Sequence, residues 1–145
     1  DATMVFGTRR LKPAVIAAAG PNLINLHGGD PESYRGLDTH LWAIYHGEFA
    51  DLVSTLHTVN EELDDGRIVE TLPVPLSRGM ALHKLRAANT GVCIRLTLSA
   101  LEELNDRGSL TSRPQRSRGR YYSFMPTILK DVCLHKFQHY TQQLP

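Results

Sequence analysis

Asn25 and His27 stand two residues apart in a short apolar run, Leu23 to His27, which is followed at once by Gly28-Gly29. In a strand, alternate side chains point to the same face, so this amide and this imidazole would project together. Both groups can donate hydrogen bonds to an oxygen that gains negative charge, and the glycines leave open space beside them. The pair predicts a site for acyl-transfer chemistry at the end of a strand.

A carboxylate follows in the polar loop of residues 60–66, between two expected strands. Asp64 in this loop could approach His27, and we expect it to raise the pKa of the imidazole and to fix its tautomer. With Asn25, the two groups could stabilise a tetrahedral intermediate and move one proton. The chain has seven histidines, so on these residues alone a structural histidine at the strand end stays an alternative.

The elements expected around these residues alternate between strands and helices. Short apolar runs predict strands, and apolar periodicity predicts helices, with Asp38 placed to cap one and Gly91 placed to bend or split another. The order is typical of an α/β fold, in which ligands gather beyond the strand ends. The expected strands are 4–6, 23–27, 52–59 and 68–74, and the expected helices are 13–19, 38–46, 80–104 and 127–142.

The composition is typical of a globular protein and argues against a polyanion-binding or membrane-spanning protein. Hydrophobic residues make up 41% of the 145 residues, which is enough for a core. Sixteen basic and fifteen acidic residues give a net charge of +1, which argues against a general polyanion-binding surface. No apolar run approaches the roughly 18–20 residues that span a bilayer, and no leader is visible. Cys93 and Cys133 are expected to be buried thiols, and the protein to be cytoplasmic.

Several short motifs occur in a fixed order along the chain. In order and spacing they resemble the signature of the 10-formyltetrahydrofolate-dependent formyltransferase family, which includes glycinamide ribonucleotide, methionyl-tRNA and amino-sugar formyltransferases. The resemblance runs from about Met4 to about Gly108. The motifs are Asn25-Leu26-His27, Tyr34-Arg35-Gly36, a helix with Trp42 and Ile44 that ends at Gly47, Thr55-Leu56-His57, and Leu63-Asp64-Asp65-Gly66-Arg67-Ile68.

The resemblance implies a fold and a set of roles. The fold would be Rossmann-like, with a central mostly parallel sheet, flanking helices and a C-terminal helical extension. Asn25 and His27 would polarise the formyl oxygen, and Asp64 would hold His27 charged and assist proton transfer from the attacking amine. Asp64 is selected over Asp65 because the family's aspartate stands two residues before the glycine. The cofactor-binding residues carried over from two pterin loops are Arg9, Leu11, Val59, Asn60, Glu61, Glu62 and Leu63.

The resemblance also implies an activity. We expect a formyl group to pass from 10-formyltetrahydrofolate, without a metal, to the primary amine of a small substrate, with a nucleotide-linked amino sugar as one candidate. The alternatives are a formyltetrahydrofolate hydrolase and a non-catalytic folate-binding fragment. His57 matches a position near the substrate in some members, and a packing role is its equal alternative.

Two departures from the family pattern leave questions open. Residues 28–33 read Gly-Gly-Asp-Pro-Glu-Ser where many members have Ser-Leu-Leu-Pro, so the amine is not identified. The chain also shows only the C-terminal portion of the domain, without the family's usual N-terminal part. A homodimer, or a partner chain that supplies the missing strands, is therefore left open, and an exposed edge at Met4–Phe6 would favour such pairing.

The remaining segments are expected to be structural. Residues 1–111 would form the partial catalytic domain, and residues 112–145 a basic linker and a C-terminal helix. We expect the four arginines of residues 113–120 to be solvated, rather than to bind phosphate or RNA. His135 and His139, near Cys133, have a spacing that allows metal ligation, but no further ligand cluster accompanies them. Neither a nucleic-acid nor a membrane partner is expected.

Overall fold

The computed structural model describes residues 1–145. Every predicted strand and helix is present, and the last helix agrees to the residue, but the helix predicted for 80–104 spans 85–107, and two short strands, at 34–36 and 120–122, were not predicted. The elements are β1 (Thr3–Phe6), α1 (Pro13–Ala19), β2 (Leu23–His27), β3 (Tyr34–Gly36), α2 (Thr39–His46), the 3-10 turn η1 (Phe49–Asp51), β4 (Val53–Thr58), β5 (Ile68–Pro73), the 3-10 turn η2 (Leu82–Lys84), α3 (Leu85–Arg107), β6 (Arg120–Tyr122) and α4 (Thr127–Gln142).

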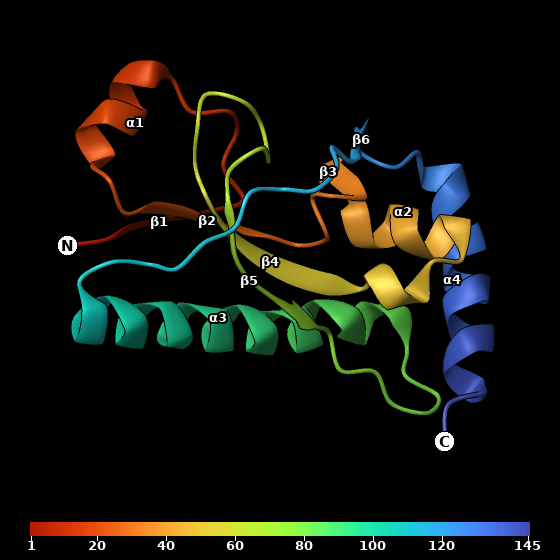
Figure 1. Ribbon diagram of the computed structural model, residues 1–145. Helices are drawn as coiled ribbons and strands as arrows, with labels where there is room; N and C mark the ends of the chain where they lie inside the picture. Colours follow the sequence, from red (N-terminus) through yellow and green to blue (C-terminus); the bar gives the residue numbers. More distant parts are fainter.

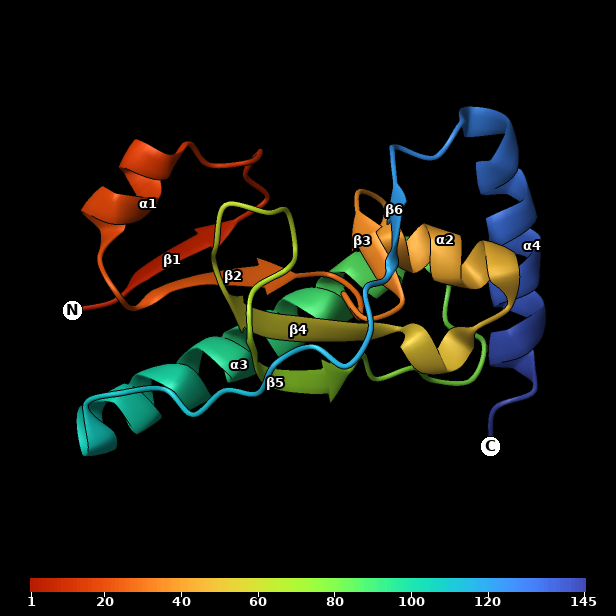
Figure 2. The ribbon, with the colours of Figure 1, turned by 45° about the horizontal axis from the view of Figure 1, so that its top comes forward.

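Four strands form the main sheet in the order β1-β2-β4-β5. The α/β class is confirmed, and the pairing within this sheet is mixed. β1 is parallel to β2, while β4 is antiparallel to both β2 and β5. The antiparallel pairing of β4 and β5 follows from the short loop that joins them, because parallel neighbours need a long crossover. The loop of this hairpin, residues 59–67, leaves the sheet beside the start of β2, where Val59 N donates to Leu23 O, and folds back toward the β1–α1 loop (Figure 1 and Figure 2).

The core lies between this sheet and α3, which runs along one face of the sheet (Figure 1). Ile24 of β2 and Leu56 of β4 are fully buried against it, as are Val92 and Leu96 of α3. The small α3 residue Gly91 neither bends nor splits the helix, which is continuous from Leu85 to Arg107. At the other end of β4, α2 packs on α4 (Figure 2).

A second sheet of two parallel strands joins β3 to β6. The segment before β6 therefore lies beside residues that precede it by about ninety positions (Figure 2). Gly119 donates its N–H to Pro31 O at 3.1 Å, and a Cβ at Gly119 would lie 2.5 Å from the same oxygen. The expectation of a free linker is corrected, because backbone pairing and close approach hold residues 113 and 119–120 against the domain. Arg116, Arg118 and Arg120 are exposed, as expected of solvated side chains.

Two further expectations can be compared with the structure. Cys93 and Cys133 are buried free thiols, as predicted. Asp38 does precede α2, but it does not cap the helix through its side chain. Its carboxylate instead accepts a hydrogen bond from Met125 N at 2.9 Å, because Asp38 adopts a left-handed conformation (φ 51°) that turns it toward the segment before α4. No helix is long and apolar enough to cross a membrane.

The β1 side of the molecule is the least covered. β1 forms one edge of the sheet, and Phe6 at its end is 63% exposed. α1 contributes no buried residue and has no side-chain cap. This region is therefore held by the pairing of β1 with β2, by the packing of Met4 against the core and by a few loop contacts.

Candidate active site

Asn25 and His57 form the centre of the site because β2 and β4 pair them directly across the sheet. Asn25 Nδ2 donates a hydrogen bond to His57 Nε2 at 3.0 Å, and His57 Nδ1 donates to the Thr58 carbonyl at 2.7 Å. These two bonds assign the proton of the neutral imidazole to Nδ1. The amide of Asn25 keeps a second N–H that this contact does not use.

His27 lies two residues beyond Asn25 on β2, opposite Thr55, and is only 6% exposed. Its Nε2 donates to the Tyr34 carbonyl at 2.9 Å, and its Nδ1 lies 3.5 Å from Asp64 Oδ1. Burial lowers the pKa of His27 below its ordinary value, although the charge of Asp64 acts in the opposite direction. The charge of Asp64 acts to raise the pKa of His27, as expected, but the cost of burying the imidazolium is the larger effect, so the expectation that Asp64 holds His27 charged is corrected.

Asp64 reaches both imidazoles from the β4–β5 loop. Its Oδ1 lies 3.7 Å from His57 Nε2, and its Oδ2 accepts the N–H of Gly36 at 2.8 Å. Burial acts to raise the pKa of Asp64, but the two neighbouring imidazoles, His57 and His27, and the hydrogen bond from Gly36 N together lower it below its ordinary value. Asp64 is therefore ionised at neutral pH. Its backbone is left-handed (φ 51°), which is uncommon for a residue other than glycine.

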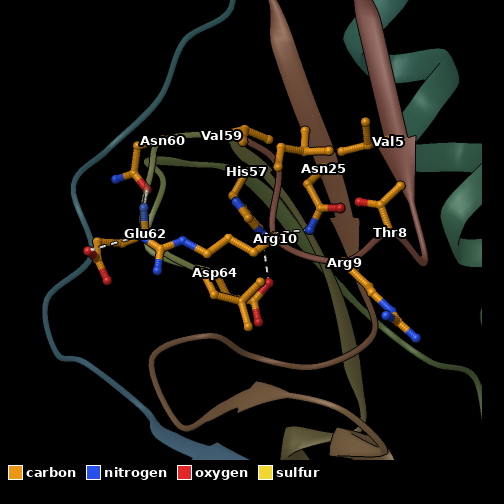
Figure 3. A pocket seen from close by; sticks show the side chains of 12 residues that line it. Val5, Thr8, Arg9, Arg10, Asn25, His57, Val59, Asn60, Glu62 and Asp64 are labelled. Atoms are coloured by element: carbon orange, nitrogen blue, oxygen red, sulfur yellow. Dashed lines mark hydrogen bonds and ion pairs between the residues drawn. The ribbon is translucent and has the colours of Figure 1, made fainter. Parts of the chain in front are cut away.

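A small cavity of about 50 Å³ opens beside this cluster (Figure 3). Its walls come from the end of β1, the β1–α1 loop, β2 and the β4–β5 loop. The predicted site residues Asn25 and Asp64 line it, together with every predicted cofactor-binding residue except Glu61. His27 does not line it and lies behind Asp64. The lining residues are Val5, Thr8, Arg9, Arg10, Leu11, Asn25, His57, Val59, Asn60, Glu62, Leu63 and Asp64.

Arg10 crosses the cavity in Figure 3, from the β1–α1 loop toward Glu62 on the opposite wall. Its Nε donates to Glu61 O at 2.7 Å, and its guanidinium lies 3.6 Å from the Glu62 carboxylate. The Arg9 side chain, although it lines the cavity, points away from the Asn25, His57 and Asp64 cluster. The β1–α1 loop thus contacts the β4–β5 loop across the cavity through the hydrogen bond and the ion pair of Arg10.

Sequence reasoning missed several residues that the structure brings to the site. Arg10 stands between two predicted residues, Arg9 and Leu11, so its position in the loop was a usable signal. Gln115 donates to Asp64 O and Gly66 O, yet it lies some fifty residues away without periodicity or motif. Arg35, only 5% exposed, donates to Leu63 O. No group of three or more His, Cys, Asp or Glu side chains is arranged to hold a metal ion, including around His135 and His139.

Comparisons with known proteins agree with this geometry. A family model described as formyl transferase matches residues 3–91. Phosphoribosylglycinamide formyltransferase of Escherichia coli (strain K12) is 31% identical over 80 residues, which cover 54% of this chain and 37% of that protein. The chain therefore spans little more than a third of this curated relative.

Solved structures show the same fold. The formyltransferase PseJ from Anoxybacillus kamchatkensis, in complex with UDP-4,6-dideoxy-4-formamido-L-AltNAc and tetrahydrofolate, is similar with a TM-score of 0.72 and 21% identity, over 86% of this chain and 65% of that chain. HypX from Aquifex aeolicus, in complex with tetrahydrofolic acid, is similar with a TM-score of 0.68 and 24% identity, over 100% of this chain and 26% of that chain.

Proposed function

The chain belongs to the formyl transferase family, and we propose that it transfers a formyl group from 10-formyltetrahydrofolate to the primary amine of a small substrate. The observation that carries the proposal is the position of Asp64. Its carboxylate contacts both His27 and His57, and it shares the cavity with the Asn25 amide and the two loops predicted to bind the pterin.

The residues around the cavity fit a folate-derived donor. Val5, Leu11, Val59 and Leu63 offer apolar walls, and the polar atoms of Thr8 and Asn60 stand between them. Apolar walls with a few placed polar groups are typical of sites for flat heteroaromatic rings. The donor supplies an activated formyl group when bound. A cavity of about 50 Å³ has room for only a few water molecules, so the wall that carries Arg10 has to move for a ring to enter.

Each polar group has a role in this proposal. The unused N–H of Asn25 would stabilise negative charge that develops on a carbonyl oxygen, an effect worth up to about 4 kcal/mol for one donor. Asp64, ionised at neutral pH, would take up the proton that the attacking amine must lose. His27, which is neutral and keeps its own proton on Nε2, would accept the proton of the amine from Asp64 at Nδ1, which lies 3.5 Å from the carboxylate. His57 would hold the Asn25 amide.

The substrate class that we propose is a nucleotide-linked amino sugar. Two observations support it: the Tyr34-Arg35-Gly36 strand carries the motif that resembles amino-sugar members, and PseJ, whose complex contains a UDP-linked formamido sugar, has the same fold. We place the protein in the cytoplasm, where both the donor and such sugars would meet it.

The test is turnover of 10-formyltetrahydrofolate, followed by absorbance, with and without a panel of nucleotide-linked amino sugars. Amine-dependent turnover is expected. Asp64→Asn should lower kcat by about 10²–10⁴, the range of general acid–base catalysis, and Asn25→Ala by a similar amount. Asp65→Asn is the matched control, because Asp65 neighbours Asp64 but its carboxylate contacts Arg118 and Asn60 rather than an imidazole, and it should change kcat little.

Other outcomes separate the alternatives. Formate release without an amine would identify a hydrolase, since only the nucleophile differs. Folate binding by calorimetry without any turnover would identify a binding module and would end the transferase proposal. Equal loss of activity in Asp64→Asn and Asp65→Asn would contradict the role given to Asp64.

The proposal for a partner concerns the outer edge of β1. Thr3 N donates to Asn22 O on the β2 side at 3.1 Å, so strand alternation leaves the N–H groups of Met4 and Phe6 on the unpaired edge. We propose that a second copy of the chain pairs there. Light scattering should detect a dimer, and Phe6→Pro, which removes an outward N–H, should weaken it. A monomer at all concentrations would rule this partner out.

A further inference from the structure

Gln115 touches the predicted catalytic loop at two points. Its side-chain Nε2 donates to Asp64 O and to Gly66 O, both at 2.9 Å. Both partners are carbonyl oxygens, so only the NH₂ end of the amide can make these bonds. The other end, Oε1, is buried without a hydrogen-bond partner. An unpartnered buried oxygen costs free energy, which indicates that the amide is held in this orientation by the two bonds that it makes.

The turn that Gln115 holds is one that needs support. Asp64 has φ 51°, a left-handed conformation that costs an ordinary L-residue about 1–2 kcal/mol. This conformation aims the carboxylate at Gly36 N (2.8 Å) and at His27 Nδ1 (3.5 Å). Strained backbone persists where its surroundings determine it from several sides. Gln115 fixes the carbonyl groups on both sides of the turn, and Gly36 fixes the side chain within it.

The segment that carries Gln115 is itself anchored. Glu32 accepts two hydrogen bonds from the Arg113 guanidinium, at 2.9 and 2.7 Å, and a third from Arg116 N. Ser117 Oγ donates to Glu32 O at 3.1 Å. Residues on both sides of Gln115 therefore hold to one residue of the loop that follows β2. The backbone on both sides of Gln115 is therefore held in place, so its side chain can hold the Asp64 turn in place.

We infer that Gln115 is a positioning residue, which holds the Asp64 turn so that the carboxylate faces His27 and the cavity. This inference deepens the proposed function, and its prediction for kcat rests on that function. The structural part stands separately, because the position of the Asp64 charge relative to His27 can be measured without any substrate.

The decisive variants are Gln115→Glu and Gln115→Ala. Glutamate keeps the shape of glutamine but replaces the NH₂ donor with an oxygen, which repels both carbonyl groups. Alanine removes the contact. Gln138→Ala on the exposed face of α4 is the matched control, since Gln138 makes no side-chain bond to the site. If Gln115→Glu does not fold, Gln115→Met replaces it, because methionine keeps the length of the side chain without a charge.

The first readout is the titration of the His27 imidazole by NMR. The charged or titratable groups that face His27 are Asp64, His57, Asp30 and His40. Because the carboxylate of Asp64 raises the pKa of His27, displacing it should lower that pKa, in the direction given by Asp64→Asn. The second readout is the split between kcat and KM. A misplaced reacting group can cost up to about 10²-fold, so we expect kcat to fall 10- to 100-fold while the KM for the donor stays within about threefold.

The outcomes separate the two proposals. An unchanged His27 titration in both Gln115 variants would overturn the inference, even if thermal stability fell, because a merely structural residue would give that result. A shifted titration in a protein without wild-type turnover would support the positioning role and would count against the proposed function alone. A shifted titration with kcat unchanged would also overturn the inference, since positioning would then have no consequence for the reaction.

Discussion

The two loops that face each other across the cavity are held very differently. The β4–β5 loop is fixed by its neighbours: Gln115 bonds its backbone, Gly36 bonds Asp64, and Arg67 donates to Ser112 Oγ at 3.0 Å and to Ser112 O at 2.7 Å. The β1–α1 loop leads into a helix without a buried residue. Its contact with the opposite wall is made through Arg10, whose side chain is 62% exposed.

This difference indicates which wall moves. Segments with few buried contacts are those that open at low free-energy cost, and an exposed ion pair such as Arg10–Glu62 contributes only about 0–1 kcal/mol. The β4–β5 wall carries Asp64, whose position decides the chemistry. The β1–α1 wall carries residues that would only contact the ring of the donor. A fixed catalytic wall opposite a movable binding wall allows the cavity to open without disturbing the Asp64 contacts.

The largest expected contrast is between two apolar residues of the strands that lead into the two walls, one buried and one exposed. Leu56, fully buried in β4, should destabilise the protein by about 2–5 kcal/mol when replaced by alanine. Phe6, 63% exposed at the end of β1, should change stability by no more than about 0.5 kcal/mol when replaced by alanine. Urea unfolding of both variants measures the difference. Equal destabilisation would show that β1 is as well packed as β4 and would end the comparison.

A pair of glycines gives the next largest contrast. A Cβ on Gly66, in the fixed wall, would lie 1.5 Å from Thr58 O, so Gly66→Ala has to push the two hairpin strands apart. Overpacking of this kind costs about 3 kcal/mol or more. A Cβ on Gly7, in the other wall, meets nothing within 4 Å, and only its φ of 64° opposes alanine, at about 1–2 kcal/mol. Thermal unfolding of the two variants should therefore differ, and a larger loss for Gly7→Ala would contradict the assignment of the walls.

The sequence predicts the residues that form the fixed wall better than the long-range contacts that hold this wall in place. Asn25, Asp64 and the loop of residues 59–63 follow from strand alternation and from motifs at set spacings, and the structure brings them to one cavity. Local pattern also predicts β4 and β5, because hydrophobic alternation and the Asp-Gly end of the loop are encoded in adjacent residues.

The sequence could not predict contacts between residues that are far apart along the chain, or the effect of burial on a pKa. Gln115 and Glu32 meet residues that lie some fifty to eighty positions away, and no periodicity marks such contacts. The charge state of His27 was misjudged for a related reason. The charge of Asp64 could be anticipated from the motif, whereas the burial that outweighs it depends on tertiary packing around His27, whose Nε2 bonds the Tyr34 carbonyl of β3.

Acid should destabilise the part of the molecule that contains the buried imidazoles of β2 and α2. Burial lowers the pKa of both His27 and His40, so each binds fewer protons in the folded state than in the unfolded state. The stability that depends on their neutral forms is complete above the ordinary pKa of 6.5 and falls as the pH drops below it, by at most about 1.4 kcal/mol per pH unit for each group. Denaturant unfolding at pH 8, 7, 6 and 5.5 measures this. A flat profile would contradict the burial of the two imidazoles.

Residues 1–22 contain no histidine, so hydrogen exchange of the β1 amides should be less sensitive to this decrease in pH.

The smallest expected effect comes from Glu32, which anchors the segment that holds the fixed wall. The hydrogen bonds from Arg113 lower the pKa of Glu32 to about 2, so this contribution is present above its ordinary pKa of 4.5 and is lost as the pH falls toward 2. Glu32→Gln should cost about 1 kcal/mol at neutral pH, because solvent around the Arg113 side chain, which is 41% exposed, screens the pair. Glu102→Gln on the exposed face of α3 is the control. Hydrogen exchange should show the amides of residues 59–67 opening more often in Glu32→Gln than in the control, while those of residues 7–12 stay the same. If both loops loosened equally, the two walls would share one anchor, and the β1–α1 loop would not be the independent, movable side of the cavity.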